Sequence, residues 1–254
     1  MKPGLVSVTF RQLPPERVVK LCVKSGLQAI EWGGDVHVPP GEPGLASRVG
    51  EMTREAGLSI AAYGSYHRLG GPSGPSFGEV LSSAVVLGAP AIRVWAGNRG
   101  SAETGKAGWK AVAEDALRCA DLAGEKGISI CYEFHAGTLT DTTESALALL
   151  AETEHPFIRS LWQPPHGKSP EECAASLRAI LPRLHHVHVF HWWPDPGHRR
   201  TLAEGRGRWE AYVAELRSAS KDADLLLEFV RDDDPLVLPD DAQTLRDILA
   251  LSGG

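Results

Sequence analysis

The sequence predicts a single (β/α)8 barrel domain spanning residues 1–254. Eight short apolar or β-branched runs alternate in strict order with eight longer amphipathic stretches, the pattern of βαβ units around a parallel sheet. A chain of 254 residues is long for one α/β sandwich and typical of one closed barrel. Neither a Ser/Gly-rich linker nor an abrupt change in composition interrupts the pattern, so we expect one domain.

Each element follows from local patterns along the chain. The predicted strands cover residues near 4–10, 27–33, 58–63, 91–95, 128–134, 157–163, 184–190 and 223–229. The predicted helices cover residues near 14–25, 44–56, 76–88, 104–126, 141–152, 169–180, 207–219 and 239–251. A glycine after a helical stretch ends several of these helices, and a proline begins others. The Gly/Pro-rich stretch 70–76 is expected to be a surface loop or, alternatively, a lid over the barrel mouth.

Composition narrows the classes of protein. A net charge of −6 argues against a nucleic-acid-binding surface. The 4 cysteines are scattered and form no Cys-x-x-Cys, which favours free thiols in a reducing cytosol. No secretion signal follows Met1, and no apolar run approaches the roughly 20 residues that span a membrane. We therefore expect a cytoplasmic protein with neither a nucleic-acid nor a membrane partner.

Four predicted strands end in a side chain that can bind a metal. These side chains are Glu133, Gln163, His188 and Glu228. In a parallel barrel all four strand ends point to one mouth, so the four groups are expected to meet. One glutamate at a strand end could belong to a structural salt bridge, but four such positions favour a shared metal. Carboxylate and amide oxygens with one imidazole suit Mn²⁺ best, while Mg²⁺, Co²⁺ or Zn²⁺ remain alternatives.

The second predicted strand carries a family resemblance. Its exit, Ala29-Ile30-Glu31-Trp32-Gly33-Gly34, resembles the signature of the xylose-isomerase-like TIM barrel superfamily, and the resemblance extends strand by strand over the whole chain. That superfamily includes sugar phosphate isomerases and epimerases, ketohexose 3-epimerases, inosose dehydratases and an AP endonuclease branch. The resemblance implies a metal held at strands 5 to 8, and Glu133, His188 and Glu228 fall on three of its ligand positions.

The fourth ligand position departs from the pattern. Relatives usually have Asp-x-x-His after strand 6, whereas this chain has Gln163-Pro164-Pro165-His166. Glutamine can donate its carbonyl oxygen, but the site loses one negative charge. Either the metal is bound by a less acidic set, or the metal site is weak or empty.

The AP endonuclease branch of the superfamily is excluded by its extra ligands. That branch needs additional histidines at strands 3 and 4. His67 could fill the first role, but strand 4 reads Arg93-Val94-Trp95 and offers none.

Aromatic and polar residues at the strand ends predict a substrate pocket. Five of the 7 tryptophans lie at or just past predicted strand ends, namely Trp32, Trp95, Trp162, Trp192 and Trp193. Aromatic faces at a barrel mouth suit the C–H faces of a sugar, although they could merely plug the barrel. The predicted substrate-binding residues are Glu31, Trp32, His67, Arg93, Trp95, His135, His166 and Arg200. A structural Glu31–Arg93 pair is the alternative for those two residues. Arg199 is the second candidate to Arg200, and a solvated loop is the alternative for both.

The function predicted from these residues is a divalent-metal-dependent sugar isomerase or epimerase. Glu133 and Glu228 would remove and return a proton through an enediolate of a ketose or keto-sugar. A lyase or dehydratase of the same superfamily is the closest alternative, and a metal-free sugar-binding barrel is the second. No Gly-rich phosphate-binding segment follows strands 7 or 8, so the expected partner is an unphosphorylated small-molecule sugar. The resemblance also implies a possible homo-oligomer.

Overall fold

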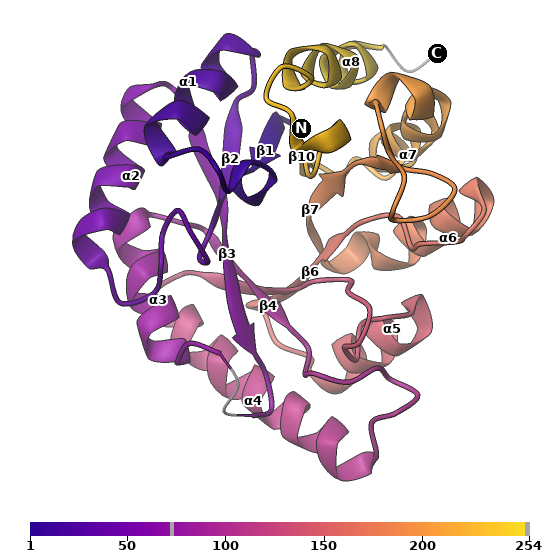
Figure 1. The fold of residues 1–254 in the computed structure, drawn as a ribbon. Coiled ribbons are helices and arrows are strands. Elements are labelled where there is room, and N and C mark those ends of the chain that lie inside the picture. The colour runs from indigo at the N-terminus through magenta and orange to yellow at the C-terminus, as the bar shows by residue number, and fades with distance from the viewer. Residues whose placement is uncertain (72–73, 252–254) are drawn as a thin grey trace.

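Eight parallel strands close into a barrel with helices around its outside (Figure 1). The computed structural model describes residues 1–71 and 74–251. The barrel strands are β1 (Pro3–Val6), β2 (Ala29–Gly33), β3 (Ser59–Arg68), β4 (Ala91–Trp95), β5 (Ser129–Tyr132), β6 (Ile158–Trp162), β7 (Leu184–Val189) and β10 (Asp224–Leu227). They pair around the ring in the order β1-β10-β7-β6-β5-β4-β3-β2, so the predicted TIM barrel is confirmed.

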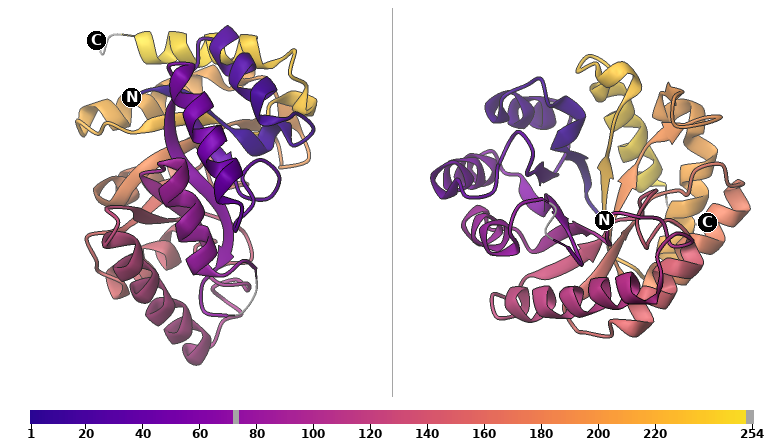
Figure 2. Two further views of the ribbon diagram at one scale, coloured as in Figure 1. Left: turned by 90° about the vertical axis from the view of Figure 1, so that its left-hand side faces the viewer. Right: turned by 60° about the horizontal axis from the view of Figure 1, so that its bottom comes forward.

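The α-helices of the described residues form one layer over the outer face of the sheet (Figure 2). They are α1 (Pro15–Lys24), α2 (Pro43–Glu55), α3 (Phe77–Leu87), α4 (Lys106–Gly124), α5 (Thr143–Glu152), α6 (Pro170–Ile180), α7 (Arg206–Ser218) and α8 (Leu238–Ala250). Ser76, Thr142 and Ser169 each close a capping box at a helix start, which satisfies backbone donors that would otherwise lack partners. None of the helices in residues 1–71 and 74–251 is long and apolar enough to cross a membrane.

Two strand predictions need correction, and both corrections shape the mouth. The predicted strand at 4–10 ends at Val6, because the chain turns into a short 3-10 helix at Ser7–Phe10. The predicted strand at 58–63 continues to Arg68, which still pairs with β4 opposite Trp95. The long end of β3 therefore stands above the barrel as part of the wall of the mouth. The predicted loop or lid at 70–76 includes residues 72–73, which lie outside the described residues.

Strand alternation divides the buried residues between the helix layer and the barrel interior. On β2, Glu31 faces inward, while Trp32 is fully buried against α2 and donates from Nε1 to Thr53 Oγ1 at 3.1 Å. Large apolar residues fill the space between sheet and helices. The interior below the mouth holds smaller groups, including Ala62, Ala91 and Cys131. Three of the buried free cysteines lie in helices and one lies in a strand.

A small ribbon rises from the segment that follows β7. Strands β8 (His191–Trp192) and β9 (Arg199–Arg200) pair antiparallel beside the mouth. The 3-10 helix Leu202–Gly205 then leads into α7. This ribbon places an aromatic and an arginine next to the strand ends.

Candidate active site

Three metal-capable side chains meet inside the mouth of the barrel. Glu133 follows β5, His188 lies in β7, and Glu228 follows β10. One ligand atom from each lies within 4.8 Å of the other two, and all three residues are buried. Their convergence follows from the parallel barrel, which brings the C-terminal ends of its strands to one side.

His188 lies between two carboxylates. Its Nε2 is 2.9 Å from Glu31 Oε2, and its Nδ1 is 3.2 Å from Glu228 Oε2. Burial opposes a charge on this imidazole, but Glu228 and Glu31 outweigh burial and raise its pKa to about 10. Because Glu31 accepts from Nε2, the Nδ1 atom faces Glu228 and is free to bind a cation in place of its proton.

Glu31 lies below these groups, where basic side chains surround its carboxylate. Its Oε2 is also 3.0 Å from His186 Nε2, and its Oε1 is 3.6 Å from Arg93 Nη1. Burial would raise its pKa, but the neighbouring His188, His186 and Arg93 hold it well below the usual range. A Cβ at Gly64 would lie 2.7 Å from Glu31 Oε1, so this carboxylate needs a glycine on β3. The Glu31–Arg93 pair, which was the alternative to substrate binding by these two residues, is thus present, and Glu31 also contacts both histidines.

Glu133 is held from the opposite side of the mouth. Arg93 Nε lies 3.3 Å from Glu133 Oε2, and Trp95 Nε1 donates a hydrogen bond to the same oxygen. Burial alone would lower the pKa of Arg93, but Glu133 and Glu31 raise it overall, so this guanidinium stays charged. Both donors engage Oε2, which leaves Oε1 available for another partner.

Gln163, at the end of β6, is oriented by its amide nitrogen. Nε2 donates to the carbonyl of Phe134 at 2.6 Å. Its Oε1 is buried and finds no hydrogen-bond partner within residues 1–71 and 74–251. A buried, unsatisfied amide oxygen is costly, and a metal ion would satisfy it.

The donor set fits a divalent cation. Carboxylate oxygens, an imidazole nitrogen held by a carboxylate on its other side, and an orphaned amide oxygen are ligands of Mn²⁺, Mg²⁺ and Zn²⁺. The buried His/Glu clusters of this barrel are thus consistent with a divalent metal site, and the identity of the metal stays a prediction.

Two further histidines stand at the rim. His135 stacks on Trp95 with ring centroids 4.4 Å apart, and His166 stacks on Trp192 at 5.2 Å. Burial lowers the pKa of His166, and the neighbouring His135 lowers it further against the opposing effect of Glu228. The neutral form of His166 is therefore favoured more than in a free imidazole.

The extended end of β3 contributes residues that the sequence prediction missed. Tyr66 lies under the Arg93 guanidinium at 5.4 Å from its ring, and Arg68 stacks over Trp95 at 3.9 Å. Both follow Gly64 by steps of two, so they share its inward face. Continuing the strand to residue 68 would have revealed them.

Three predicted pocket residues point away from the mouth. Trp32 lies in the helix layer, and Trp162 does the same, with Nε1 donating to Ser176 on α6 at 3.2 Å. His67 is odd-numbered on β3, so it faces outward and its Nδ1 lies 2.9 Å from the carbonyl of Pro75. In each case the alternation of strand side chains decides, since an inward neighbour forces the next residue outward.

Of the two loop arginines, the second candidate for substrate binding lies nearer the mouth than the first. Arg200 donates to the carbonyl of Trp193 at 2.8 Å and is 3.2 Å from Glu204, so it braces its own loop. Arg199, the second candidate, lies 4.5 Å from the Phe229 ring centroid and 5.5 Å from that of Trp192. Arg199 is therefore the arginine of the ribbon that reaches the aromatic wall of the mouth.

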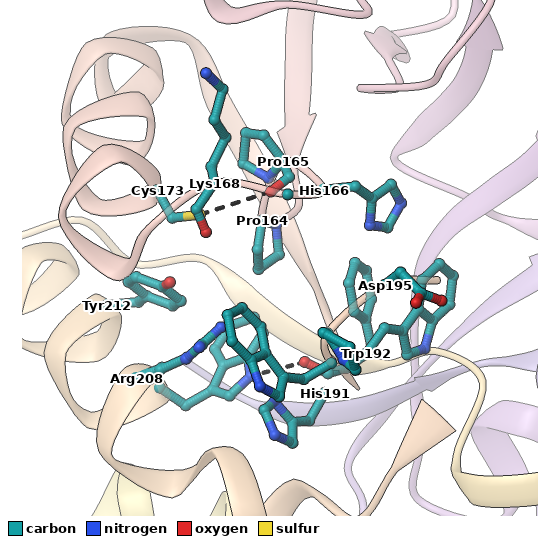
Figure 3. Close-up of a pocket in the computed structure, with 15 residues that line it drawn as sticks. Pro164, Pro165, His166, Lys168, Cys173, His191, Trp192, Asp195, Arg208 and Tyr212 are labelled. Atoms are coloured by element: carbon teal, nitrogen blue, oxygen red, sulfur yellow. Dashed lines mark hydrogen bonds between the residues drawn. The ribbon is translucent and has the colours of Figure 1, made fainter. Parts of the chain in front are cut away.

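A crevice opens beside the mouth, between α6, α7 and the ribbon (Figure 3). His166 and Trp192 line both the crevice and the mouth, while Arg208 lies 4.0 Å from the ring centroid of Trp193. Neither Glu133 nor Glu228 lines this crevice. The crevice therefore lies beside the carboxylates of Glu133 and Glu228 and does not include them.

Comparison with known proteins agrees with this architecture. A solved structure described as a probable 3-DHS dehydratase from Bacillus anthracis is 20% identical, with a TM-score of 0.81 over 97% of this chain and 99% of that one. A D-psicose 3-epimerase from Clostridium cellulolyticum H10 is 15% identical, with a TM-score of 0.75 over 97% of each chain. At these identities the two structures establish the fold alone.

Sequence relatives are named as dehydratases. An inosose dehydratase of Clostridium perfringens is 33% identical over 82 residues, which is 32% of this chain and 28% of the relative. A 3-dehydroshikimate dehydratase of Bacillus anthracis is 26% identical over 154 residues, 53% of this chain and 54% of the relative. The chain thus spans less than a third of the inosose dehydratases that it matches and about half of the second relative. The family model described as xylose isomerase-like TIM barrel matches residues 19–249, and the chain belongs to that family.

Proposed function

We propose that the protein is a divalent-metal-dependent dehydratase acting on a small hydroxylated ketone. The observation that carries the proposal is the convergence of Glu133, His188 and Glu228 at the mouth. The names of the two sequence relatives described above favour dehydration over the epimerisation expected first, because both are named as dehydratases.

The proposed metal ligands are Glu133, Gln163, His188 and Glu228. When bound there, the cation would polarise the substrate carbonyl and acidify the adjacent C–H bond. Glu31 holds the imidazole of His188, and Arg93 with Trp95 holds Glu133. This surrounding shell fixes the ligand atoms before substrate arrives.

The two rim histidines are the proposed acid–base pair. His166, with a lowered pKa, is suited to take the proton next to the carbonyl. His135, stacked on Trp95, is suited to protonate the departing hydroxyl. A C–H and a C–O bond break, a C=C bond forms and water leaves, so the reaction needs no oxidant or reductant.

The charge of the wall favours a substrate with a carboxylate. Arg68 stacks on Trp95 and donates to the carbonyl of Gly97 at 3.2 Å. Within the described part of the chain it makes no ion pair with a carboxylate of the protein. We therefore expect a carboxylated ring ketone such as 3-dehydroshikimate to be preferred over the uncharged inosose.

An epimerase is the second candidate. Glu133 and Glu228 meet around one point, and two carboxylates so placed could remove and return a proton without loss of a hydroxyl. In that mechanism the two glutamates carry the proton transfer, and the rim histidines only bind substrate.

One experiment separates the two candidates. The purified protein is incubated with Mn²⁺ in D2O with 3-dehydroshikimate, an inosose or a ketohexose, and the products are identified by mass spectrometry. Dehydration yields a product lighter by one water, and epimerisation yields an isomer that carries deuterium. Loss of water from a ring ketone supports the proposal, whereas deuterium incorporation without loss of water would establish the epimerase instead.

A further inference from the structure

A second group of metal-capable side chains lies on the outer side of the sheet. His67 projects outward from β3 toward α4, where Asp115 and Cys119 sit four residues apart on one helix face. Figure 1 shows the far end of β3 reaching α4. None of these residues contacts Glu133, His188 or Glu228 in the contacts found among the described residues, so the two groups are separate.

One ligand atom from each of the three residues lies within 4.8 Å of the other two. His67 Nε2 is 3.9 Å from Cys119 Sγ and 3.9 Å from Asp115 Oδ2, and Cys119 Sγ is 3.8 Å from Asp115 Oδ1. Tetrahedral zinc with ordinary bond lengths would set such separations at about 3.3–3.6 Å. Shortening these separations by roughly 0.3–0.6 Å would therefore bring the three residues within bonding distance of one zinc ion.

The ring of His67 is oriented as in a metal ligand. Its Nδ1 is 2.9 Å from the carbonyl of Pro75, which can only accept a hydrogen bond, so Nδ1 carries the proton. The Nε2 lone pair then points at Asp115 and Cys119, and the residue is only 6% exposed. A backbone carbonyl that holds the far nitrogen is the usual second contact of a metal-bound histidine.

We propose that His67, Asp115 and Cys119 form a zinc site that ties the end of β3 to α4. Sulfur, imidazole and carboxylate together suit Zn²⁺, and three protein ligands leave the fourth position to water. An open surface groove lined by His67, Asp115 and Arg118 gives access to it.

The other contacts of Asp115 are compatible with the metal. Arg118 Nη2 lies 2.6 Å from Oδ1, and the Gly70 amide donates to Oδ2 at 2.9 Å. Each carboxylate oxygen has a second lone pair, so both contacts can persist. Burial raises the pKa of the Cys119 thiol to about 12, so a bound cation must displace that proton. The rival arrangement is a thiol that donates to His67 with no metal.

Cobalt distinguishes the two arrangements, because only a thiolate ligand gives a sulfur-to-cobalt charge-transfer band in the near ultraviolet. The titration uses the full chain carrying Glu133→Gln, which weakens the mouth site, and Cys131→Ser, which removes the thiol near His185 and His186. We expect the band with one equivalent of Co²⁺, and its loss in Cys119→Ser and in His67→Gln. Cys22→Ser, a matched buried helix thiol, should retain it.

Melting temperatures measured with and without Zn²⁺ distinguish the loss of a metal ligand from misfolding of a variant. Zn²⁺ should raise the melting temperature of the Glu133→Gln, Cys131→Ser protein and of its Cys22→Ser derivative. It should not raise that of the Cys119→Ser derivative, whose circular dichroism must match the parent. Absence of the cobalt band, or a band that survives Cys119→Ser, would overturn the proposal. Because neither readout uses turnover, the proposal can fail while the dehydratase stands, and the reverse also holds.

Discussion

The mouth cluster (Glu133, His188, Glu228) and the outer cluster (His67, Asp115, Cys119) each orient a histidine ring toward possible metal ligands. They do so with different groups. Each contains a buried histidine with one ring nitrogen held and the other turned toward possible ligands. Inside the barrel, the carboxylate of Glu31 holds His188. Outside it, the neutral carbonyl of Pro75 holds His67. The mouth cluster draws its residues from several strands, whereas the outer cluster takes two from a single helix face.

The difference lies in charge and in donor softness. The mouth cluster is rich in carboxylates, which raise the pKa of His188 to about 10. His188 therefore stays protonated until a cation replaces the proton. The outer cluster has one carboxylate and one thiol, which favours a softer ion. The barrel thus combines a group of hard oxygen and nitrogen ligands at its mouth with a sulfur-containing group between β3 and α4.

The largest effect should come from the mouth carboxylates. Glu228→Gln keeps the shape but removes a charge from the metal site, so turnover should fall by on the order of 10³-fold. Steady-state assays at saturating Mn²⁺ measure this, with the exposed Glu144→Gln as the control carboxylate. Turnover within a few-fold of the parent would remove Glu228 from the mechanism.

Next in size is the loss of the carboxylate that holds His188. Glu31→Gln should weaken Mn²⁺ binding by about 10–100-fold, because the imidazole loses both its orientation and part of its basicity. Isothermal titration with Mn²⁺ gives the affinity directly. Unchanged affinity would mean that Glu31 serves only Arg93 and His186.

Metal binding at the mouth cluster should depend on pH. The pKa of His188 is raised to about 10, so below pH 9 each bound cation must displace one proton. Mn²⁺ affinity should therefore rise about tenfold per pH unit between pH 6.5 and 8.5. Titrations in buffers of different ionisation enthalpy would also report the released proton, and a flat profile would exclude His188 as a ligand.

The smallest effect concerns Asp241, a buried carboxylate. It accepts a hydrogen bond from the Leu202 amide at 2.8 Å, and burial raises its pKa to about 6. A raised carboxyl pKa penalises the ionised form, so stability should increase as pH falls from 7 toward 5. Asp241→Asn should raise the unfolding free energy at pH 7 by about 1–3 kcal/mol and flatten that dependence. Urea denaturation at both pH values tests it, and a destabilised variant would contradict this account.

Most of the fold could be predicted from the sequence. The alternation of apolar and amphipathic stretches, and the glycines and prolines at helix ends, were consistent along the whole chain. It also placed Glu133, His188 and Glu228 together, since parallel strand ends must share one mouth. The errors came from strand parity and length. Trp32 lies one residue beyond the inward-facing Glu31, so its side chain faces the helices. Tyr66 was missed because the third strand was predicted to end at residue 63.

Other features depend on contacts between distant segments. The free oxygen of Gln163 follows from the Phe134 carbonyl that captures its amide nitrogen, and sequence spacing does not encode that orientation. The outer cluster likewise joins His67 to a helix more than forty residues away.

Anomalous diffraction from crystals soaked in Mn²⁺ would show whether the mouth cluster is a metal centre. One manganese peak is expected within bonding distance of Glu133, Glu228, His188 Nδ1 and Gln163 Oε1. A mouth without a peak, with His188 still between Glu31 and Glu228, would contradict this expectation.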